Sequence, residues 1–290
     1  MLVTEGVLAY PSTLLPTPLS YREHLPHPML RPFVRCVWEL AGDSQVSEPQ
    51  VIVPDGCTEL VLNLGDPIEQ LIGVAGSLAQ PRVTVVGEIR RPVVTLTTGR
   101  IDLLGVRFLP GGLQPFISTP IGEIVDRIEA HDDVLTRAMR ETIARVQNAC
   151  IADRLELLEI GLIDTLQKAK RLDNALTRRV VRALMDHEGC IRMEALAEEF
   201  GVTRRHIERA FALGVGASPK SLSQVLRFRR ALVAIENEDE HWTDVAEACG
   251  YYDQSHLIRD FRRFAGSTRS TYLRSNHPLN GLFHGIVTAT

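Results

Sequence analysis

The sequence has 290 residues and a mass of 32.3 kDa, which is long enough for two domains that each have a hydrophobic core. Hydrophobic residues make up 44% of it, a share typical of soluble proteins, and no apolar run is long enough to span a membrane. The net charge is −4, and the five cysteines form no CxxC pair, which argues against a disulfide framework and a structural zinc site. The sequence shows no signal-peptide pattern, so a cytoplasmic protein is expected.

The first third of the chain is expected to be rich in β-strands. Residues 1–30 contain many Pro, Ser and Thr residues and are expected to form an irregular lead-in. From about Phe33 to Phe108, short apolar or β-branched runs alternate with Gly and Pro, which is typical of an antiparallel sandwich or barrel. The expected strands are Val51–Val53, Glu59–Leu64, Val83–Val86, Val93–Thr97 and Ile101–Phe108.

Helical periodicity follows this region. Three helices are expected, over residues 133–148, 153–171 and 174–187. In the second, Leu155, Leu158 and Leu162 belong to one apolar face. Two interpretations of that face stay open: the helix packs on the β-rich domain, or the leucines form the seam of a homodimer.

A helix-turn-helix pattern occurs twice in the last hundred residues. The first unit reads LAEEFGVTRRHIERAF, from Leu196 to Phe211, and the second reads VAEACGYYDQSHLIRDF, from Val245 to Phe261. Gly201 aligns with Gly250, and after one inserted residue His206, Arg209 and Phe211 align with His256, Arg259 and Phe261. Two such units favour a protein that presents two recognition helices to two stretches of DNA groove.

Each unit contains the signals of a tight turn followed by a capped helix. Gly201 and Gly250 supply the permissive backbone of the turns, while Thr203 and Asp253 can cap the second helices. Apolar residues fill the inner faces, and Ile258 is assigned to the core with Leu257 and Phe261 in the second unit. The residues left for DNA are Arg204, Arg205, Glu208 and Arg209 in the first unit, and Gln254, Ser255, His256 and Arg259 in the second.

A long helix is expected between the units, from about Pro219 to Asn237. Proline suits the first turn of a helix, and Phe228, Ala231, Leu232 and Ile235 form one apolar stripe. Roughly nineteen residues span about 28 Å, and successive major grooves lie about 34 Å apart. Such a helix could therefore hold two recognition helices near one turn of DNA apart.

Residues Ile191–Arg274 resemble the AraC/XylS family of transcription regulators. The resemblance rests on both units, on Gly216-Ala217-Ser218-Pro219, on Arg227 and Ala231 of the connecting helix, and on Tyr272. It implies a two-lobed DNA-binding domain, commonly in an activator that contacts RNA polymerase. By position, it places Arg205, Glu208 and Arg209 opposite bases in the first lobe, and Gln254, Ser255, His256 and Arg259 in the second.

Two positions depart from the family pattern. Arg269 stands where the family usually has a proline, and Leu222 stands where it usually has an aromatic residue. Both positions concern helix starts and packing, so we expect altered stability more than lost function. The N-terminal part resembles the sensor-side domain of some members of the family through IVPDGCTELVLNLG (Ile52–Gly65) and LLGVRFLPGG (Leu103–Gly112), a shorter match.

The chemistry of an enzyme is not apparent in the sequence. The stretch from Val51 to Phe108 contains no histidine, so the histidine cluster of a cupin-type metal site is missing. Asp55 and Glu59 flank Cys57, but no histidine lies nearby in sequence to activate its thiolate. Gly-rich phosphate loops, nucleophile elbows and Walker patterns are also missing. We therefore expect neither catalysis nor a cofactor or metal.

Together these patterns predict an α+β, multidomain transcription regulator that binds double-stranded DNA. Residues 1–172 are expected to form a β-rich, barrel- or sandwich-like domain with accessory helices that senses a small-molecule effector or dimerises. Residues 173–276 are expected to form an all-α DNA-binding domain, and residues 277–290 a tail. One alternative is a DNA-binding regulator whose N-terminal domain only mediates assembly. A more distant one is a ligand-binding barrel without DNA binding.

Overall fold

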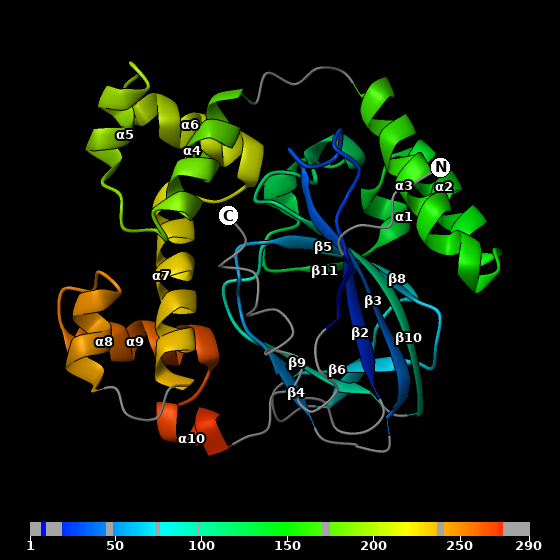
Figure 1. Ribbon diagram of the computed structural model, residues 1–290, viewed down its shortest axis with the longest axis horizontal. Coiled ribbons are helices and arrows are strands. Elements are labelled where there is room, and N and C mark those ends of the chain that lie inside the picture. The colour runs from blue at the N-terminus through cyan, green and yellow to red at the C-terminus, as the bar shows by residue number, and fades with distance from the viewer. Residues whose placement is uncertain are drawn as a thin grey trace.

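A β-rich half and a helical half lie side by side in the computed structural model of the protein (Figure 1). The structure describes residues 7–9, 19–44, 49–72, 76–97, 99–169, 175–236 and 241–274. The predicted fold class is confirmed, because the strands and their accessory helices precede an all-α region. The predicted boundary between residues 172 and 173 and the predicted tail 277–290 lie outside the described residues.

The strands form two antiparallel sheets. The larger has the order β1-β2-β3-β10-β5-β8-β11 and the smaller β4-β9-β6-β7. The larger sheet contains β1 (Val7–Ala9), β2 (Ser20–His24), β3 (Val34–Ser44), β5 (Thr58–Asn63), β8 (Val83–Val86), β10 (Gly99–Phe108) and β11 (Ile128–Ala130). The smaller contains β4 (Gln50–Ile52), β6 (Ile68–Leu71), β7 (Ser77–Ala79) and β9 (Val93–Thr97). All five predicted strands are present, but β1 and β2 both lie in the segment that was expected to be an irregular lead-in.

The alternation of side chains along β10 divides the core into two layers. Leu104, Val106 and Phe108 join the cluster on the face that helices cover. Ile101 and Leu103 join a second cluster, which also contains Ile68 of the smaller sheet. The larger sheet is therefore the middle layer, with helices on one face and the smaller sheet on the other.

Three helices, α1 (His131–Val134), α2 (Arg137–Gln147) and α3 (Ile151–Lys168), accompany the β-rich half. Leu158 and Leu162 on α3 are fully buried in the cluster against the larger sheet. The packing interpretation of this apolar face is therefore correct, and these two leucines are not available as a dimer seam. The predicted helix 133–148 is interrupted, because Leu135 and Thr136 are extended and Thr136 caps α2.

The helical half consists of two small cores connected by one long helix. Its helices are α4 (Ala175–Asp186), α5 (Met193–Glu199), α6 (Arg204–Val215), α7 (Pro219–Glu236), α8 (Trp242–Ala248), α9 (Gln254–Ala265) and α10 (Arg269–Arg274). Helix α4 shares a core with α5 and α6, whereas α8, α9 and α10 pack around the second half of α7. Phe228 on α7 anchors the second core, since its ring lies 5.8 Å from that of Phe261 and 5.1 Å from that of Phe264. None of the described helices combines the length and apolarity needed to cross a membrane.

Glu88, just after β8, is a buried carboxylate that is expected to make the stability of the protein depend on pH. It is 2% exposed, and within the described residues neither of its oxygens has a hydrogen-bond partner. Burial raises the pKa of Glu88 to about 7, with Arg90 opposing the shift and Asp126 and Asp55 adding to it. Because the folded state disfavours the ionised form, the contribution of Glu88 to stability is expected to be most favourable below its reference pKa of 4.5. This contribution should be lost as the pH rises from 4.5 through 7, by about 3 kcal/mol in all.

This expectation can be tested by urea unfolding of the wild type and Glu88→Gln between about pH 5 and pH 8. The amide variant stays neutral, so its advantage over the wild type should grow with pH. Glu69→Gln, which removes an exposed carboxylate from β6, is the matched control. Parallel pH profiles for the wild type and Glu88→Gln would show that Glu88 does not carry the dependence.

Candidate nucleic-acid interface

The first helix-turn-helix unit folds as its sequence predicts. Gly201 has a positive φ of 64° in the turn between α5 and α6. The Thr203 side chain caps α6 by accepting a hydrogen bond of 3.2 Å from the backbone N–H of His206. Ile207 and Phe211 are fully buried, so the opposite side of α6 faces outward.

The second unit repeats the same geometry. Gly250 has a φ of 71°, and Asp253 accepts a 2.7 Å hydrogen bond from the backbone N–H of His256. Leu257 and Phe261 are buried as expected. The two turns and the two caps are therefore equivalent, which supports the interpretation of the sequence repeat as a duplicated structural unit.

The predicted contact residues of the first unit are all exposed on α6. Arg204 is held by two carboxylates, at 2.9 Å from Glu208 and 3.1 Å from Glu194. Within the described residues, neither Arg205 nor Arg209 forms an ion pair. These two arginines can thus turn toward a ligand without breaking an existing bridge.

In the second unit, three of the four predicted contact residues, Gln254, Ser255 and Arg259, are exposed on α9. The fourth, His256, is half-buried and makes contacts within its own unit. Its ring meets Tyr251 edge-on at 5.2 Å, and its Nε2 lies 3.7 Å from a carboxylate oxygen of the buried Asp260. This ring is therefore already engaged within its own unit.

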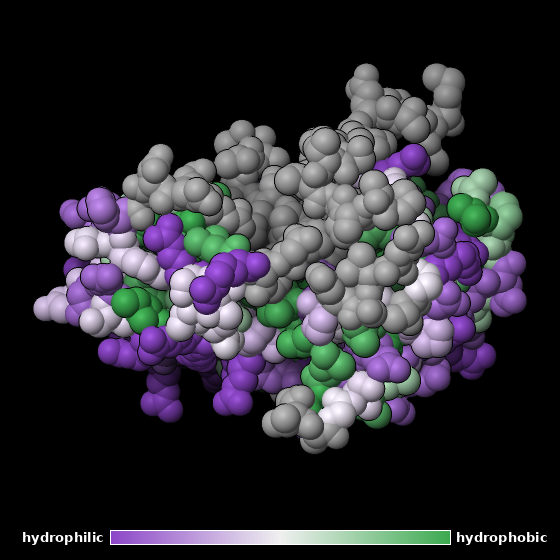
Figure 2. All heavy atoms as spheres, turned by 90° about the horizontal axis from the view of Figure 1, so that it is seen from below, coloured by the Kyte–Doolittle hydropathy of each residue, from purple (hydrophilic) through white to green (hydrophobic). Residues whose placement is uncertain are grey.

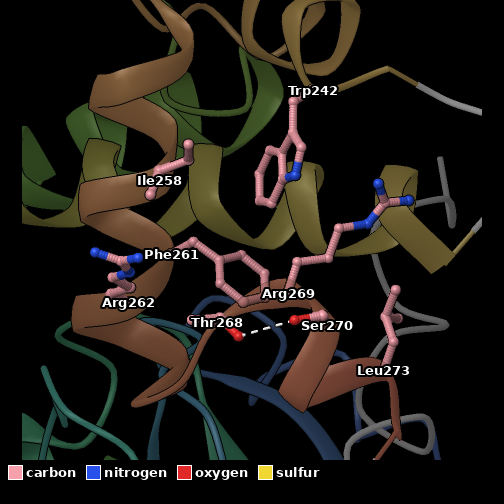
Figure 3. Close-up of a pocket in the computed structure, with 8 residues that line it drawn as sticks. All are labelled: Trp242, Ile258, Phe261, Arg262, Thr268, Arg269, Ser270 and Leu273. Carbon is pink, nitrogen blue, oxygen red and sulfur yellow. Dashed lines mark hydrogen bonds between the residues drawn. The ribbon is translucent and has the colours of Figure 1, made fainter.

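Ile258 was wrongly assigned to the core. It is half-exposed and aligns with Glu208 of the first unit, so it lies at a position that faces outward in both units. Figure 3 shows Ile258 and Phe261 on α9 beside Trp242, in a groove of about 450 Å³. The sequence repeat itself contained this signal, since the partner of an exposed glutamate is expected to be exposed too. An apolar side chain at this position could contact a thymine methyl group.

The groove is completed by one residue in the last turn of α9 and by residues that follow this helix. Its remaining lining residues are Arg262, Thr268, Arg269, Ser270 and Leu273, with the Thr268 and Ser270 hydroxyl oxygens 3.1 Å apart (Figure 3). Arg269, which replaces the usual proline, stacks over Trp242 at 5.6 Å and donates a 3.3 Å hydrogen bond to the carbonyl of Ile235. This departure from the family pattern thus makes packing contacts between α10 and the rest of the second unit.

Helix α7 sets the separation of the two units. Its eighteen residues run from Pro219 to Glu236 and span about 27 Å. Seen from below, hydrophilic side chains project along the edge of the helical half (Figure 2). Two exposed, arginine-containing helix faces connected by one helix can contact two groove segments of one duplex. Among the described residues, no group of three or more His, Cys, Asp or Glu side chains could hold a metal ion.

Comparisons with known proteins match one family to the β-rich half and another to the helical half. Residues 22–129 match a family described as a domain of unknown function (DUF6597), and residues 196–275 match a helix-turn-helix domain. The HTH-type transcriptional activator RhaS of Citrobacter koseri is 28% identical over 140 residues, which are 43% of this chain and 49% of that protein. RhaS of Escherichia fergusonii is 26% identical over 153 residues, or 48% of this chain and 54% of that protein. The chain thus spans about half the length of the curated relatives it matches.

Solved structures of ToxT from Vibrio cholerae also align with the chain. One at 1.65 Å resolution has a TM-score of 0.42 and 10% sequence identity, with 82% of this chain and 98% of that chain covered. The crystal structure of ToxT from Vibrio cholerae O395 gives a TM-score of 0.40 at 9% identity and covers 84% of this chain and 98% of that chain.

Proposed function

We propose that this chain, whose C-terminal domain is a member of the AraC/XylS family of helix-turn-helix proteins, is a sequence-specific DNA-binding transcription regulator. The observation that carries the proposal is the duplicated unit. Two recognition helices with equivalent caps and turns expose their outer faces, and one helix connects them. The relatives named as transcriptional activators support activation as the direction of regulation.

Base recognition is assigned to the exposed residues of the two recognition helices. Arg205 and Arg209 in the first unit and Arg259 in the second suit guanine O6 and N7, while Gln254 suits adenine and Ser255 a base or a phosphate. Three further predicted residues already have side-chain partners within their own unit, which limits how they can reach DNA. Arg204 and Glu208 bind each other and would act as a pair, and His256 would have to leave Tyr251 and Asp260 to reach DNA.

The β-rich domain is assigned to regulation. We propose that it binds a small-molecule effector, and that homodimerisation and contact with RNA polymerase accompany activation in the cytoplasm. The second candidate function is a regulator whose β-rich domain only mediates assembly. A thermal-shift screen separates the two, because a ligand that binds only the folded state raises the unfolding midpoint.

The proposal is tested by selecting bound sequences from a random duplex pool with the full-length protein at near-physiological salt. The expected result is a motif of two blocks about one helical turn apart. Its enrichment should be lost when both Arg205 and Arg259 are replaced by alanine. Enrichment of a motif that is the same for the wild type and this variant, or of none at all, would contradict the proposal.

A further inference from the structure

A turn of the β-rich domain packs directly against α7. The segment Pro54–Cys57 connects β4 and β5, and Gly56 in it has a φ of +81°. A Cβ atom on Gly56 would lie 2.6 Å from a terminal methyl group of Leu222, so the turn lies directly against this side chain of α7. Leu222, the position that is usually aromatic in the family, is thus buried where the two halves of the protein meet.

Buried charges lie at the same contact. Asp55 Oδ2 lies 3.5 Å from Arg107 Nη2 and 4.0 Å from Arg229 Nη1 on α7. Arg107 and Arg229 are 4% and 6% exposed, so water does not screen their charges. Burial alone would raise the pKa of Asp55, but the charges of Arg107 and Arg229, together with smaller effects such as the hydrogen bond from the Cys57 N–H, lower it. Asp55 is therefore ionised and connects the β-rich domain to the middle of α7.

The orientation of the Asp55 carboxylate is fixed by its own turn. Its Oδ1 accepts a 2.9 Å hydrogen bond from the backbone N–H of Cys57. Arg107 is held in turn by Glu59, whose Oε1 accepts a 2.7 Å hydrogen bond from Arg107 Nε. The groups that face Arg229 are thus fixed within the β-rich domain. Movement of α7 away from this domain would separate Arg229 from Asp55.

The β-rich domain also contacts the far end of each recognition helix. At the first unit, Gln114 Nε2 donates to the carbonyl of Leu213 at 3.3 Å, and Arg90 Nη2 donates to that of Gly216 at 3.4 Å. At the second unit, a Cβ on Gly266 would lie 2.8 Å from the ring of Pro92. All these contacts involve the C-terminal ends of α6 and α9, whereas the proposed base-reading residues lie nearer the N-terminal ends and stay exposed. The β-rich domain therefore touches both units without covering their DNA-binding faces.

We propose that the β-rich domain braces the two helix-turn-helix units at one fixed spacing, and that Asp55, through Arg229, is the positioning residue of this brace. This proposal rests on the proposed function, and it explains how the protein would distinguish operators by the separation of their two blocks. Apart from the brace, the units are connected by α7, which packs into two separate cores, and by a contact of Cys190 Sγ with the carbonyl of Cys249 at 3.8 Å. A braced protein loses less freedom on binding and rejects sites whose two blocks have the wrong separation.

The brace itself is tested on the free, full-length protein by hydrogen exchange. In Asp55→Asn, amides near Leu213–Gly216 and near Gly266 should exchange faster than in the wild type. Gln114→Ala is the second variant, because it removes one exposed contact and leaves the buried charges in place. Glu69→Gln, which removes an exposed carboxylate from the same domain, should match the wild type. Unchanged exchange at both segments in Asp55→Asn and Gln114→Ala would overturn the brace whether or not the protein binds DNA.

Its effect on specificity is tested with the selected operator and with versions whose two blocks are one or two base pairs closer or farther apart. A shift of one base pair should weaken wild-type binding about tenfold, the size of a typical mismatch. In Asp55→Asn, the same shift should weaken binding less than about threefold, which would be a much weaker preference for one spacing. Faster exchange with an unchanged spacing preference would overturn the role in specificity. Faster exchange in a protein that selects no motif would refute the proposed function and leave the brace standing.

Discussion

Replacing Arg205 and Arg259 together by alanine is expected to weaken binding to the selected operator by about 2–6 kcal/mol. Each arginine lies exposed on a different recognition helix and forms no ion pair within the described residues, so its loss removes a DNA contact without disturbing the fold. A bidentate contact with guanine is worth about 1–3 kcal/mol, and losses at well-separated positions add roughly. Fluorescence anisotropy with a labelled operator at constant salt measures the difference.

The matched control is the pair Arg127→Ala and Arg137→Ala, which removes the same charge from exposed positions of the β-rich domain. This control should bind almost like the wild type. An equal loss on operator and random DNA in the Arg205/Arg259 variant would assign these arginines to phosphates. Wild-type affinity in that variant would show that the two recognition faces are wrongly assigned.

Local signals in the sequence were sufficient for the helix-turn-helix units. Thr203 and Asp253 cap the recognition helices, and Gly201 and Gly250 have the positive φ that their turns require. Each of these features depends on a few neighbouring residues, so a pattern in one sequence can report it. The same holds for β8 and β9, whose short β-branched runs gave their bounds correctly.

Errors arose where burial depends on distant residues. Strand β2 was missed inside a Pro-rich segment, because Tyr21 is buried against β3 and β10 and not by any neighbour in sequence. Ile258 was assigned to the core on its apolar character alone, although its aligned position in the first unit holds an exposed glutamate. The contact of Asp55 with Arg229 joins residues that are far apart in the sequence, and no local pattern indicates it.

Replacing Arg107 by methionine is expected to destabilise the protein by about 3–5 kcal/mol. Arg107 is 4% exposed on β10, and its Nη2 lies 2.7 Å from Glu59 and 3.5 Å from Asp55. Methionine keeps much of the side-chain volume but leaves two carboxylates in the interior without their main cation. Urea unfolding at neutral pH measures the loss. Arg100→Met, at an exposed position of the same strand, should cost less than about 1 kcal/mol.

The pH dependence of this variant separates a lost charge from lost packing. Burial raises the pKa of Glu59, and Asp55 raises it further, while Arg107 is the main group that lowers it. Without Arg107 the pKa of Glu59 should rise again, so the destabilisation should be largest above that pKa and shrink as acid protonates the carboxyl. The double variant Glu59→Gln/Arg107→Met should recover part of the stability at neutral pH for the same reason. A loss that is independent of pH and not recovered in the double variant would mean that the arginine acts mainly through packing.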